Sequence, residues 1–336
     1  MSWRRIGQLA VIPALLSMAA CTATSVRRAS GDAPAASPSA DASSPGRHVR
    51  AGERIGTVWV PGAPLSVGFG FGSLWVTVAQ DVGGLVARID PATGRTIATV
   101  QVGAFPVGIV AGFGSMWQAA HEDGTVARID PATNSVTATI PVGPGPAEIA
   151  VAGGLVWVAN QDATVAAVDP ATNRRVKLVH VGAGTQFRRL FAGAGSIWTD
   201  NTNGGISRID PATGTVAAAI RIPRCCEGGL ALHDGLLLAS NIPDGRLYRI
   251  NTATNRVVDH VDVGPTPNGI ALAGGKLWVS HDKSLVVSWH TLDSGRRLGS
   301  VKLDGAGFVA VTADPGDSSV WVQMLDAEAV AELAAG

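Results

Sequence analysis

Residues 115–134 read SMWQAAHEDGTVARIDPATN, and this stretch decides the fold. It holds an apolar run around a Trp, a polar loop, an alternating run and an Asp-Pro-Ala-Thr-Asn turn. The unit returns with 40 to 43 residues between anchors, which are Trp75, Trp117, Trp157, Trp198, Leu238, Trp278 and Trp321. Repeats of this length, made of short β-runs and turn residues, are typical of β-propeller blades.

Each repeat contains four runs of strand length. In the second repeat they cover residues 106–111, 115–120, 125–130 and 135–142, and each is bounded by Gly, Pro, Asn or Asp. We therefore predict an all-β, seven-bladed propeller of four-stranded antiparallel blades, with strands a to d from the axis outward. The Asp-Pro-Ala-Thr turn suits the c–d connection, because Asp bonds its own backbone and Gly or Asn accepts a positive φ. We expect the repeated Trp to fill the space between blades.

The two ends of the repeat array predict how the ring closes. Residues 54–60 resemble a d strand, whereas the last repeat offers only three runs, at 307–312, 319–324 and 329–333. The N-terminal strand can complete the seventh blade and leave no open sheet edge.

The N-terminus predicts export. Arg4 and Arg5 precede an apolar stretch that is too short for a good membrane span. It ends in Met18-Ala-Ala-Cys21, which resembles a bacterial lipobox, so residues 1–21 are expected to be a lipoprotein signal peptide with Cys21 lipidated. An ordinary secretory peptide is the alternative. Residues 22–52 are rich in Ala, Ser and Pro and predict a disordered tether, followed by the propeller at 53–336. The expected location is the outer face of the bacterial cell membrane.

Composition limits the partners. The formal net charge is zero and 15% of residues are charged, so no basic surface for nucleic acid is expected. Three cysteines do not make a disulfide-rich scaffold. We expect a monomer that meets the membrane only through its lipid anchor.

The repeats resemble a known family. A Pro-x-x-Ile-Ala run precedes Trp-Val-Ala-Asn160 or Trp-Val-Ser-His281, and an Ile-Asp-Pro-Ala-Thr-Asn turn follows. Over about residues 54–325 this is similar to the YVTN-repeat, YncE-like family of bacterial propellers. The resemblance implies a secreted or surface propeller. Distant cousins, the streptogramin lyases and the gluconolactonase and regucalcin propellers, are metal-assisted enzymes, but fold does not transfer chemistry.

Positions that break the repeat are the candidates for function. Three residues after the anchor, blades 3 to 6 carry Asn160, Asn201, Asn241 and His281. These side chains either contact a ligand or close turns, since Asn often does the latter.

The loops that lead into the a strands differ more. Blades 3 and 4 place Glu148, Arg188 and Arg189 where other blades have small residues. An Arg pair at the mouth of the channel suits a carboxylate or phosphate, and a Glu148–Arg189 ion pair between blades is the alternative.

Two further breaks bear on chemistry. Cys225 and Cys226 are adjacent and could form a vicinal disulfide, stay as free thiols or bind a soft metal. His121, Glu122 and Asp123 crowd one loop, either as a base or metal site or as a solvated turn.

These features favour a binding protein over an enzyme. We expect recognition of a small anionic ligand or a partner protein of the cell envelope on the loop face of blades 3 to 6. No cofactor is expected and no catalytic residue is assigned. The alternative is a metal-dependent lyase or lactonase, which would use a divalent metal.

Overall fold

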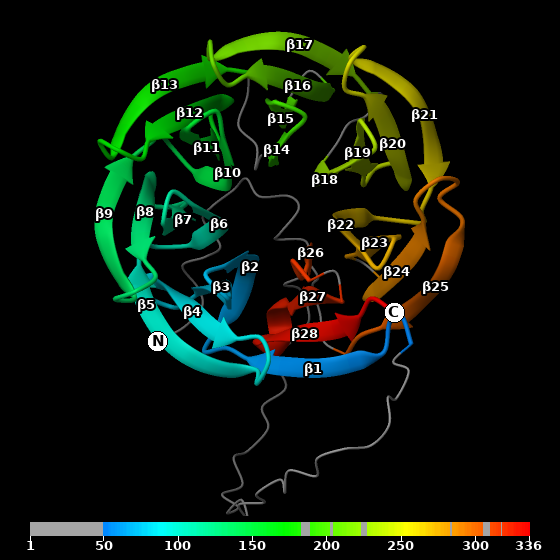
Figure 1. Ribbon diagram of the computed structural model, residues 1–336, viewed down its shortest axis with the longest axis horizontal. Helices are drawn as coiled ribbons and strands as arrows, with labels where there is room; N and C mark the ends of the chain where they lie inside the picture. The colour runs from blue at the N-terminus through cyan, green and yellow to red at the C-terminus, as the bar shows by residue number, and fades with distance from the viewer. Residues whose placement is uncertain are drawn as a thin grey trace, which may run out of the picture.

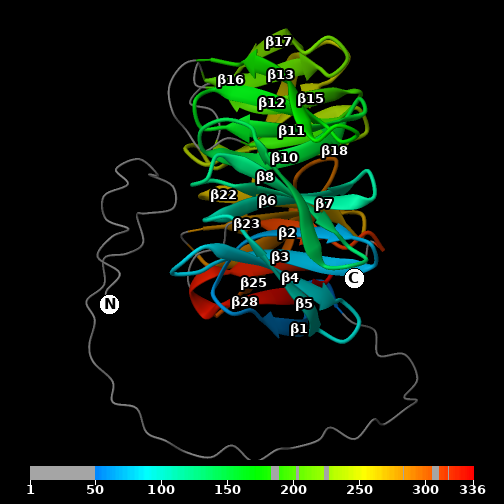
Figure 2. The same ribbon diagram turned by 90° about the vertical axis from the view of Figure 1, so that its left-hand side faces the viewer.

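The computed structural model describes residues 50–182, 189–201, 204–222, 227–282, 284–304, 310–316 and 318–336. Seven four-stranded antiparallel sheets stand in a ring around one axis, seen end-on in Figure 1 and from the side in Figure 2. This confirms the predicted all-β, seven-bladed propeller. The predicted signal peptide, Cys21 and most of the tether lie outside the described residues. In the described ranges no helix has the length and hydropathy needed to cross a membrane.

The a strands line the axis and the b strands stand behind them. The a strands are β2 (Ala63–Gly70), β6 (Pro106–Gly112), β10 (Pro146–Ala152), β14 (Leu190–Gly193), β18 (Glu227–His233), β22 (Pro267–Ala273) and β26 (Val311–Ala313). The b strands are β3 (Ser73–Ala79), β7 (Ser115–Ala120), β11 (Leu155–Asn160), β15 (Ser196–Asn201), β19 (Leu236–Asn241), β23 (Lys276–His281) and β27 (Ser319–Met324).

The c and d strands form the outer half of each blade. The c strands are β4 (Gly84–Asp90), β8 (Thr125–Asp130), β12 (Thr164–Asp169), β16 (Gly205–Asp210), β20 (Arg246–Asn251), β24 (Val286–Thr291) and β28 (Ala329–Ala334). The d strands are β5 (Arg95–Val102), β9 (Ser135–Pro141), β13 (Arg174–His180), β17 (Thr215–Arg221), β21 (Arg256–Asp262), β25 (Arg297–Lys302) and β1 (Arg54–Trp59). A short 3₁₀ turn, η2 (Leu325–Ala327), joins β27 to β28.

The ring is closed by the N-terminal strand. β1 pairs antiparallel with β28, with Trp59 opposite Ala329. The backbone N–H of Gly52 donates to the carbonyl of Ala334 at 2.9 Å, and the N–H of Ala334 donates to the carbonyl of Glu53 at 2.9 Å. The predicted closure is therefore confirmed. Of the seventh a strand, predicted at 307–312, the structure describes Val311–Ala313, and residues 305–309 lie outside the described residues.

The repeated Trp packs between blades, as predicted. Trp117 of blade 2 is fully buried and shares a cluster with Val156 and Val158 of blade 3. The indole N–H donates to the carbonyl five residues upstream in Trp75, Trp117, Trp157, Trp198 and Trp278, for example from Trp117 to Gly112 at 2.9 Å. The large flat ring thus fills the gap between two twisted sheets while its polar atom is satisfied.

Candidate functional site

The residues that face the axis sit on bulges. In blades 3, 5 and 6 the a–b register shifts near the start of the a strand, between Pro146 and Ile149, Glu227 and Leu230, and Pro267 and Ile270. A bulge bends the strand and re-aims its side chains. Glu148 and Asn268 lie within two of these shifts. The loop face of the propeller is defined here as the face that carries the d–a and b–c loops.

Arg189 joins three blades at the axis. Its Nη1 lies 3.2 Å from Oε1 of Glu148 in blade 3, and its Nη2 donates to Oδ1 of Asn268 in blade 6 at 2.6 Å. Its backbone N–H donates to Oδ1 of Asp200 at 2.8 Å. Asn268 in turn donates from Nδ2 to Oδ2 of Asp282 at 2.8 Å. We call Glu148, Arg189, Asp200, Asn268 and Asp282 the axial cluster.

The Arg189 guanidinium is held but not saturated. It has five N–H donors, and its side chain makes two hydrogen bonds to the described residues, through Nη1 and Nη2. The side chain of Arg189 is 17% exposed and that of Glu148 is 30% exposed. An oriented, partly buried guanidinium with unused N–H groups can donate hydrogen bonds to a carboxylate or phosphate oxygen.

Two glycines in blade 5 let β18 pack closely against β19 and β22. A Cβ at Gly228 would lie 2.4 Å from the carbonyl oxygen of Ser240, and one at Gly229 would lie 2.8 Å from the backbone nitrogen of Ile270. Larger residues would therefore push β18 away from its neighbours. The paired glycines keep blade 5 thin at the axis, where β14 and β22 lie on either side of β18 (Figure 1).

The predicted Asn and His ring lies behind the axis rather than in it. Asn160 is fully buried and donates from Nδ2 to the carbonyl of Val142 and to Oγ1 of Thr164, at 3.2 and 3.0 Å. Asn241 is also fully buried. Asn201 ends β15, and its side chain lies outside the description. These contacts tie the b–c loops to neighbouring strands.

His281 is buried and bonded through both ring nitrogens. Nδ1 lies 2.8 Å from the carbonyl of Pro265 and Nε2 lies 2.8 Å from Oγ of Ser288. Ser288 also lies 2.8 Å from Nε2 of His290, which is 1% exposed. Neither Ser288 nor His290 was singled out from the sequence, because both occupy strand positions that are apolar in most other blades.

His121, Glu122 and Asp123 do not converge. Nδ1 of His121 lies 3.1 Å from the carbonyl of Pro146, and burial lowers the pKa of this ring. Asp123 accepts from the backbone N–H of Ala104 at 2.9 Å, while Glu122 is exposed. Across the described parts of the chain, no three His, Cys, Asp or Glu side chains come together as a metal site would require.

Three predicted site residues cannot be placed. Arg188, Cys225 and Cys226 lie outside the described residues, and so does the remainder of the segment 183–188. The axial cluster is therefore built from Glu148 and Arg189 together with Asp200, Asn268 and Asp282.

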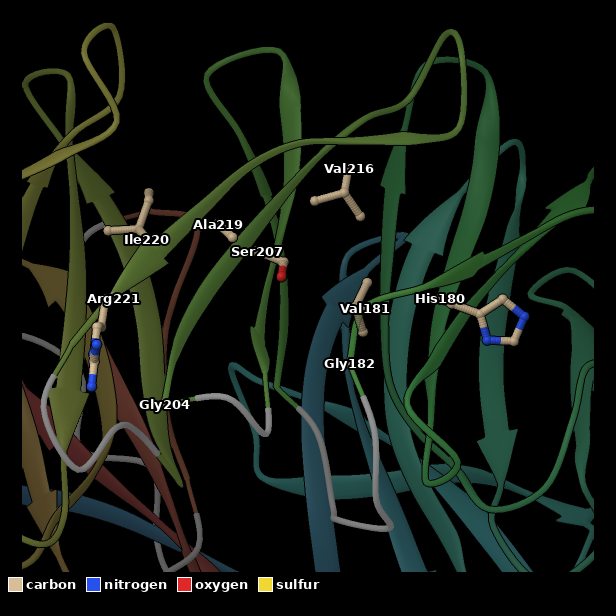
Figure 3. A pocket seen from close by; sticks show the side chains of 9 residues that line it. All are labelled: His180, Val181, Gly182, Gly204, Ser207, Val216, Ala219, Ile220 and Arg221. Carbon is tan, nitrogen blue, oxygen red and sulfur yellow. The ribbon is translucent and has the colours of Figure 1, made fainter.

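A surface groove lies apart from the axial cluster. It has a volume of about 340 Å³ and lies between blades 3 and 4, against the outer strands β13, β16 and β17 (Figure 3). Its lining is largely apolar, with Val181, Val216 and Ile220, and includes His180 and Arg221. No residue of the axial cluster lines it, so the groove and the cluster are separate features.

Comparison with known proteins supports the fold alone. No protein-family model matches the chain, and no curated protein matches its sequence. Many solved structures match its fold. One is the hydrazine synthase of Kuenenia stuttgartiensis, with a TM-score of 0.69 and 14% identity over 81% of this chain and 95% of that chain. The chain is thus a seven-bladed β-propeller, and its function has to be argued from its own residues.

Proposed function

We propose that the protein is an extracytoplasmic binding propeller that holds a small anionic ligand at the axial cluster. The observation that carries the proposal is the Arg189 guanidinium, which Glu148 and Asn268 orient from opposite sides. Blades 3, 4 and 6 supply the polar groups around it. A carboxylate carried by a partner protein of the cell envelope would use the same arginine.

Glu148 sets the strength of such binding. Its carboxylate lies 3.2 Å from Arg189 and competes with any incoming anion for the same charge. A ligand has to displace this carboxylate or share the arginine with it. The proposal therefore predicts opposite effects for the two residues, whereas an ion pair that merely fastens two blades predicts that both substitutions only weaken the fold.

The test is a thermal-shift and calorimetric titration of the full-length chain with citrate, succinate and inorganic phosphate. A ligand that binds only the native state raises stability by about 2.7 kcal/mol at a hundredfold excess over Kd. Arg189→Gln should weaken binding about tenfold to a hundredfold, the loss expected for hydrogen bonds to a charged group. Glu148→Gln should bind the same anion more tightly than the natural chain.

The control is Arg174→Gln. It removes an exposed arginine on β13, the outer strand of blade 3, away from the axial cluster. It should leave binding unchanged. No shift with any of the three anions, or equal affinity in Arg189→Gln, would contradict the proposal. A fall in stability in EDTA that one divalent metal restores would instead favour the lyase or lactonase alternative.

We also propose that the protein is a lipoprotein anchored through Cys21. Support comes from Arg4 and Arg5, the apolar stretch after them and the Met18-Ala-Ala-Cys21 end. Mass spectrometry of the chain purified from bacterial membranes should find a lipid-modified N-terminal Cys21, and Cys21→Ala should release the protein from the membrane fraction. Membership of the YVTN-repeat, YncE-like family is consistent with such a surface location.

A further inference from the structure

Blade 6 departs from the repeat at three positions that lie next to one another. His281 stands where blades 3 and 5 have Asn160 and Asn241. Ser288 pairs with Val279 at a position that is alanine in blades 1, 2, 3 and 7, and blade 4 also has a serine there, Ser207. His290 pairs with Leu277 at a position that is apolar in blades 1 to 5, where Ile89, Ile129, Val168, Ile209 and Ile250 stand. Structure alone would accept the common residue at each position.

The three side chains form one hydrogen-bonded chain inside the blade. The carbonyl of Pro265, in the loop that leads into β22, lies 2.8 Å from Nδ1 of His281. Oγ of Ser288 lies 2.8 Å from Nε2 of His281 and 2.8 Å from Nε2 of His290. Nδ1 of His290 lies 2.9 Å from the carbonyl of Gly295, in the c–d turn. This row of hydrogen bonds thus links a d–a loop on the loop face to a c–d turn on the opposite face.

A count of protons shows which protonation state this row of four hydrogen bonds requires. A carbonyl only accepts, so both Nδ1 atoms must carry hydrogen. If both rings are neutral, both Nε2 atoms are then acceptors. The Ser288 hydroxyl has one proton and can donate to only one of them, which would leave two lone pairs facing each other at 2.8 Å. All four contacts become hydrogen bonds when one ring is an imidazolium.

We propose that His281, Ser288 and His290 form a single proton-binding unit, which carries one shared proton in the folded protein and makes blade 6 sensitive to pH. The proton sits on Nε2 of one imidazole, which donates to Ser288, while Ser288 donates to the other. Exchange of roles between the two rings requires only the transfer of one proton across each contact. The rings therefore titrate as a pair.

The surroundings limit the unit to one proton. Burial lowers the pKa of both imidazoles, the carbonyls of Pro265 and Gly295 oppose that effect, and Arg297 adds to the lowering. The positive charge of one ring likewise disfavours the other. Arg297 lies opposite His290 and Lys302 lies opposite Val286 in the β24–β25 ladder. Arg297 and a proton already on one ring therefore both disfavour a second proton on the unit.

Several other charged groups on blade 5, on β23 and in the loop after it have partners of their own. In blade 5, Arg246 pairs with Asp262 at 3.3 Å and Arg249 pairs with Asp259. On β23, Lys276 donates to the carbonyls of Gly274 and Ala335, and Asp282, which follows that strand, accepts from Asn268. Within the described residues no carboxylate forms an ion pair with either imidazole. The shared proton is therefore held by the hydrogen-bond count rather than by a counter-ion.

The test is ¹⁵N nuclear magnetic resonance of the histidine rings in the full-length chain between pH 5 and 8. A shared proton should give both Nε2 atoms chemical shifts between those of protonated and unprotonated nitrogen, and both rings should change together. If both Nε2 atoms show unprotonated shifts down to the pH at which the protein unfolds, the proposal is wrong.

Two variants separate the unit from ordinary packing. Ser288→Ala introduces the residue that blades 1 to 3 carry at this position, so it should fold, and its two rings should titrate independently. The triple variant His281→Asn, Ser288→Ala, His290→Ile restores the residues that are common at these positions in the other blades and removes both histidines of the unit. Persistence of the paired titration in Ser288→Ala would overturn the role of the hydroxyl.

Chemical denaturation against pH counts the protons independently. Below about pH 6.5 the unfolded chain binds a proton on each of these histidines, and the folded unit holds one in total. Relative to the triple variant, the unfolding equilibrium constant should therefore rise about tenfold for each pH unit below that value. About a hundredfold would mean that both rings stay neutral in the fold, and would contradict a shared proton.

Discussion

At the scale of single residues, arginines on the c strands fasten neighbouring blades. Arg128 stacks 5.0 Å from the centre of the Trp117 ring. Its Nη1 donates to the carbonyl of Pro170 at 2.7 Å and to Oδ1 of Asn173 at 2.9 Å, both in the c–d turn of the next blade. Arg88 and Arg208 make the same contacts. The Asn that ends such a turn therefore serves two purposes, since it also adopts a positive φ.

At the junction between blades 3 and 4 both the arginine and the asparagine are absent. Blade 3 has Ala167 in place of the arginine, and the following turn ends in Gly214 rather than Asn. There the Nζ of Lys177, from a d strand, donates to the carbonyl of Pro211 at 3.2 Å. The junction is thus held by a different cation, which explains why the repeat tolerates the loss of both partners.

Arg128→Ala should lower the free energy of unfolding by about 2 kcal/mol, because a stacked cation and two charged hydrogen bonds are lost. Arg128→Lys should recover part of the loss, since lysine keeps the charge without the planar fork. Denaturation of both variants checks this. The exposed Arg174→Ala is the control and should change stability by less than about 0.5 kcal/mol; equal losses in the two alanine variants would contradict the clamp.

At the scale of elements, the c–d turns of blades 1 to 4 each begin with an aspartate, which are Asp90, Asp130, Asp169 and Asp210. In blade 2, Oδ1 of Asp130 accepts from the backbone N–H of Ala132 at 2.8 Å and Oδ2 accepts from Thr133 at 3.0 Å. These hydrogen bonds hold the pKa of Asp130 below its usual value of 3.8. The pKa values of Asp90, Asp169 and Asp210 are lowered in the same way. Asn251 of blade 5 accepts the equivalent backbone hydrogen bonds without a charge.

These turns predict part of the acid sensitivity of the protein. A carboxyl whose pKa is lower in the folded state stabilises the fold above its unfolded pKa, and the contribution is lost as the pH falls through the folded value. Replacing all four turn aspartates with Asn should therefore flatten the loss of stability between about pH 4 and pH 2. Thermal unfolding across that range compares the variant with the natural chain, and parallel acid profiles would show that the turns contribute nothing.

At the scale of the whole molecule, the ring depends on a seam between its two ends. Deletion of residues 53–60 removes β1 and leaves β28 as an unpaired strand edge, which is a template for aggregation. We expect the shortened chain to aggregate, as measured by size-exclusion chromatography and light scattering. Deletion of residues 30–37, upstream of the propeller, is the matched control. A soluble, cooperatively unfolding chain without 53–60 would contradict the closure.

Most of the architecture could be predicted because each repeat position meets the same neighbours in every blade. The Trp anchors and Asp turns therefore predicted the period and the strand order. The run at residues 54–60 and the incomplete last repeat predicted the closure. The site could be predicted from the sequence only where a charged residue replaces the uncharged residue of other blades, as at Glu148 and Arg189. Asn268 was missed because it lies 79 residues from Arg189 and two blades away, so that only the closed ring brings the two side chains together.

Ser288 and His290 could have been found by the comparison of repeats that highlighted His281. They were overlooked because function was sought at the loops, whereas both lie within a strand. Burial hides such residues from a search for exposed chemistry, yet a polar side chain in a core position has to find a partner. The mismatch with the apolar residues of the other blades was the available signal.

The pairing of β1 with β28 also has a consequence for the order in which the protein folds. β1 is synthesised before every other strand of the propeller and has no partner until β28 exists, so the seventh blade cannot be completed before β28 has been synthesised. Bringing such distant segments together costs loop-closure entropy, and contacts between strands that are close in sequence do not offset this cost. The six other blades can each form from consecutive strands. We expect closure of the seam to be the late, slow step of folding, and the open ring to be the species that most needs protection from aggregation.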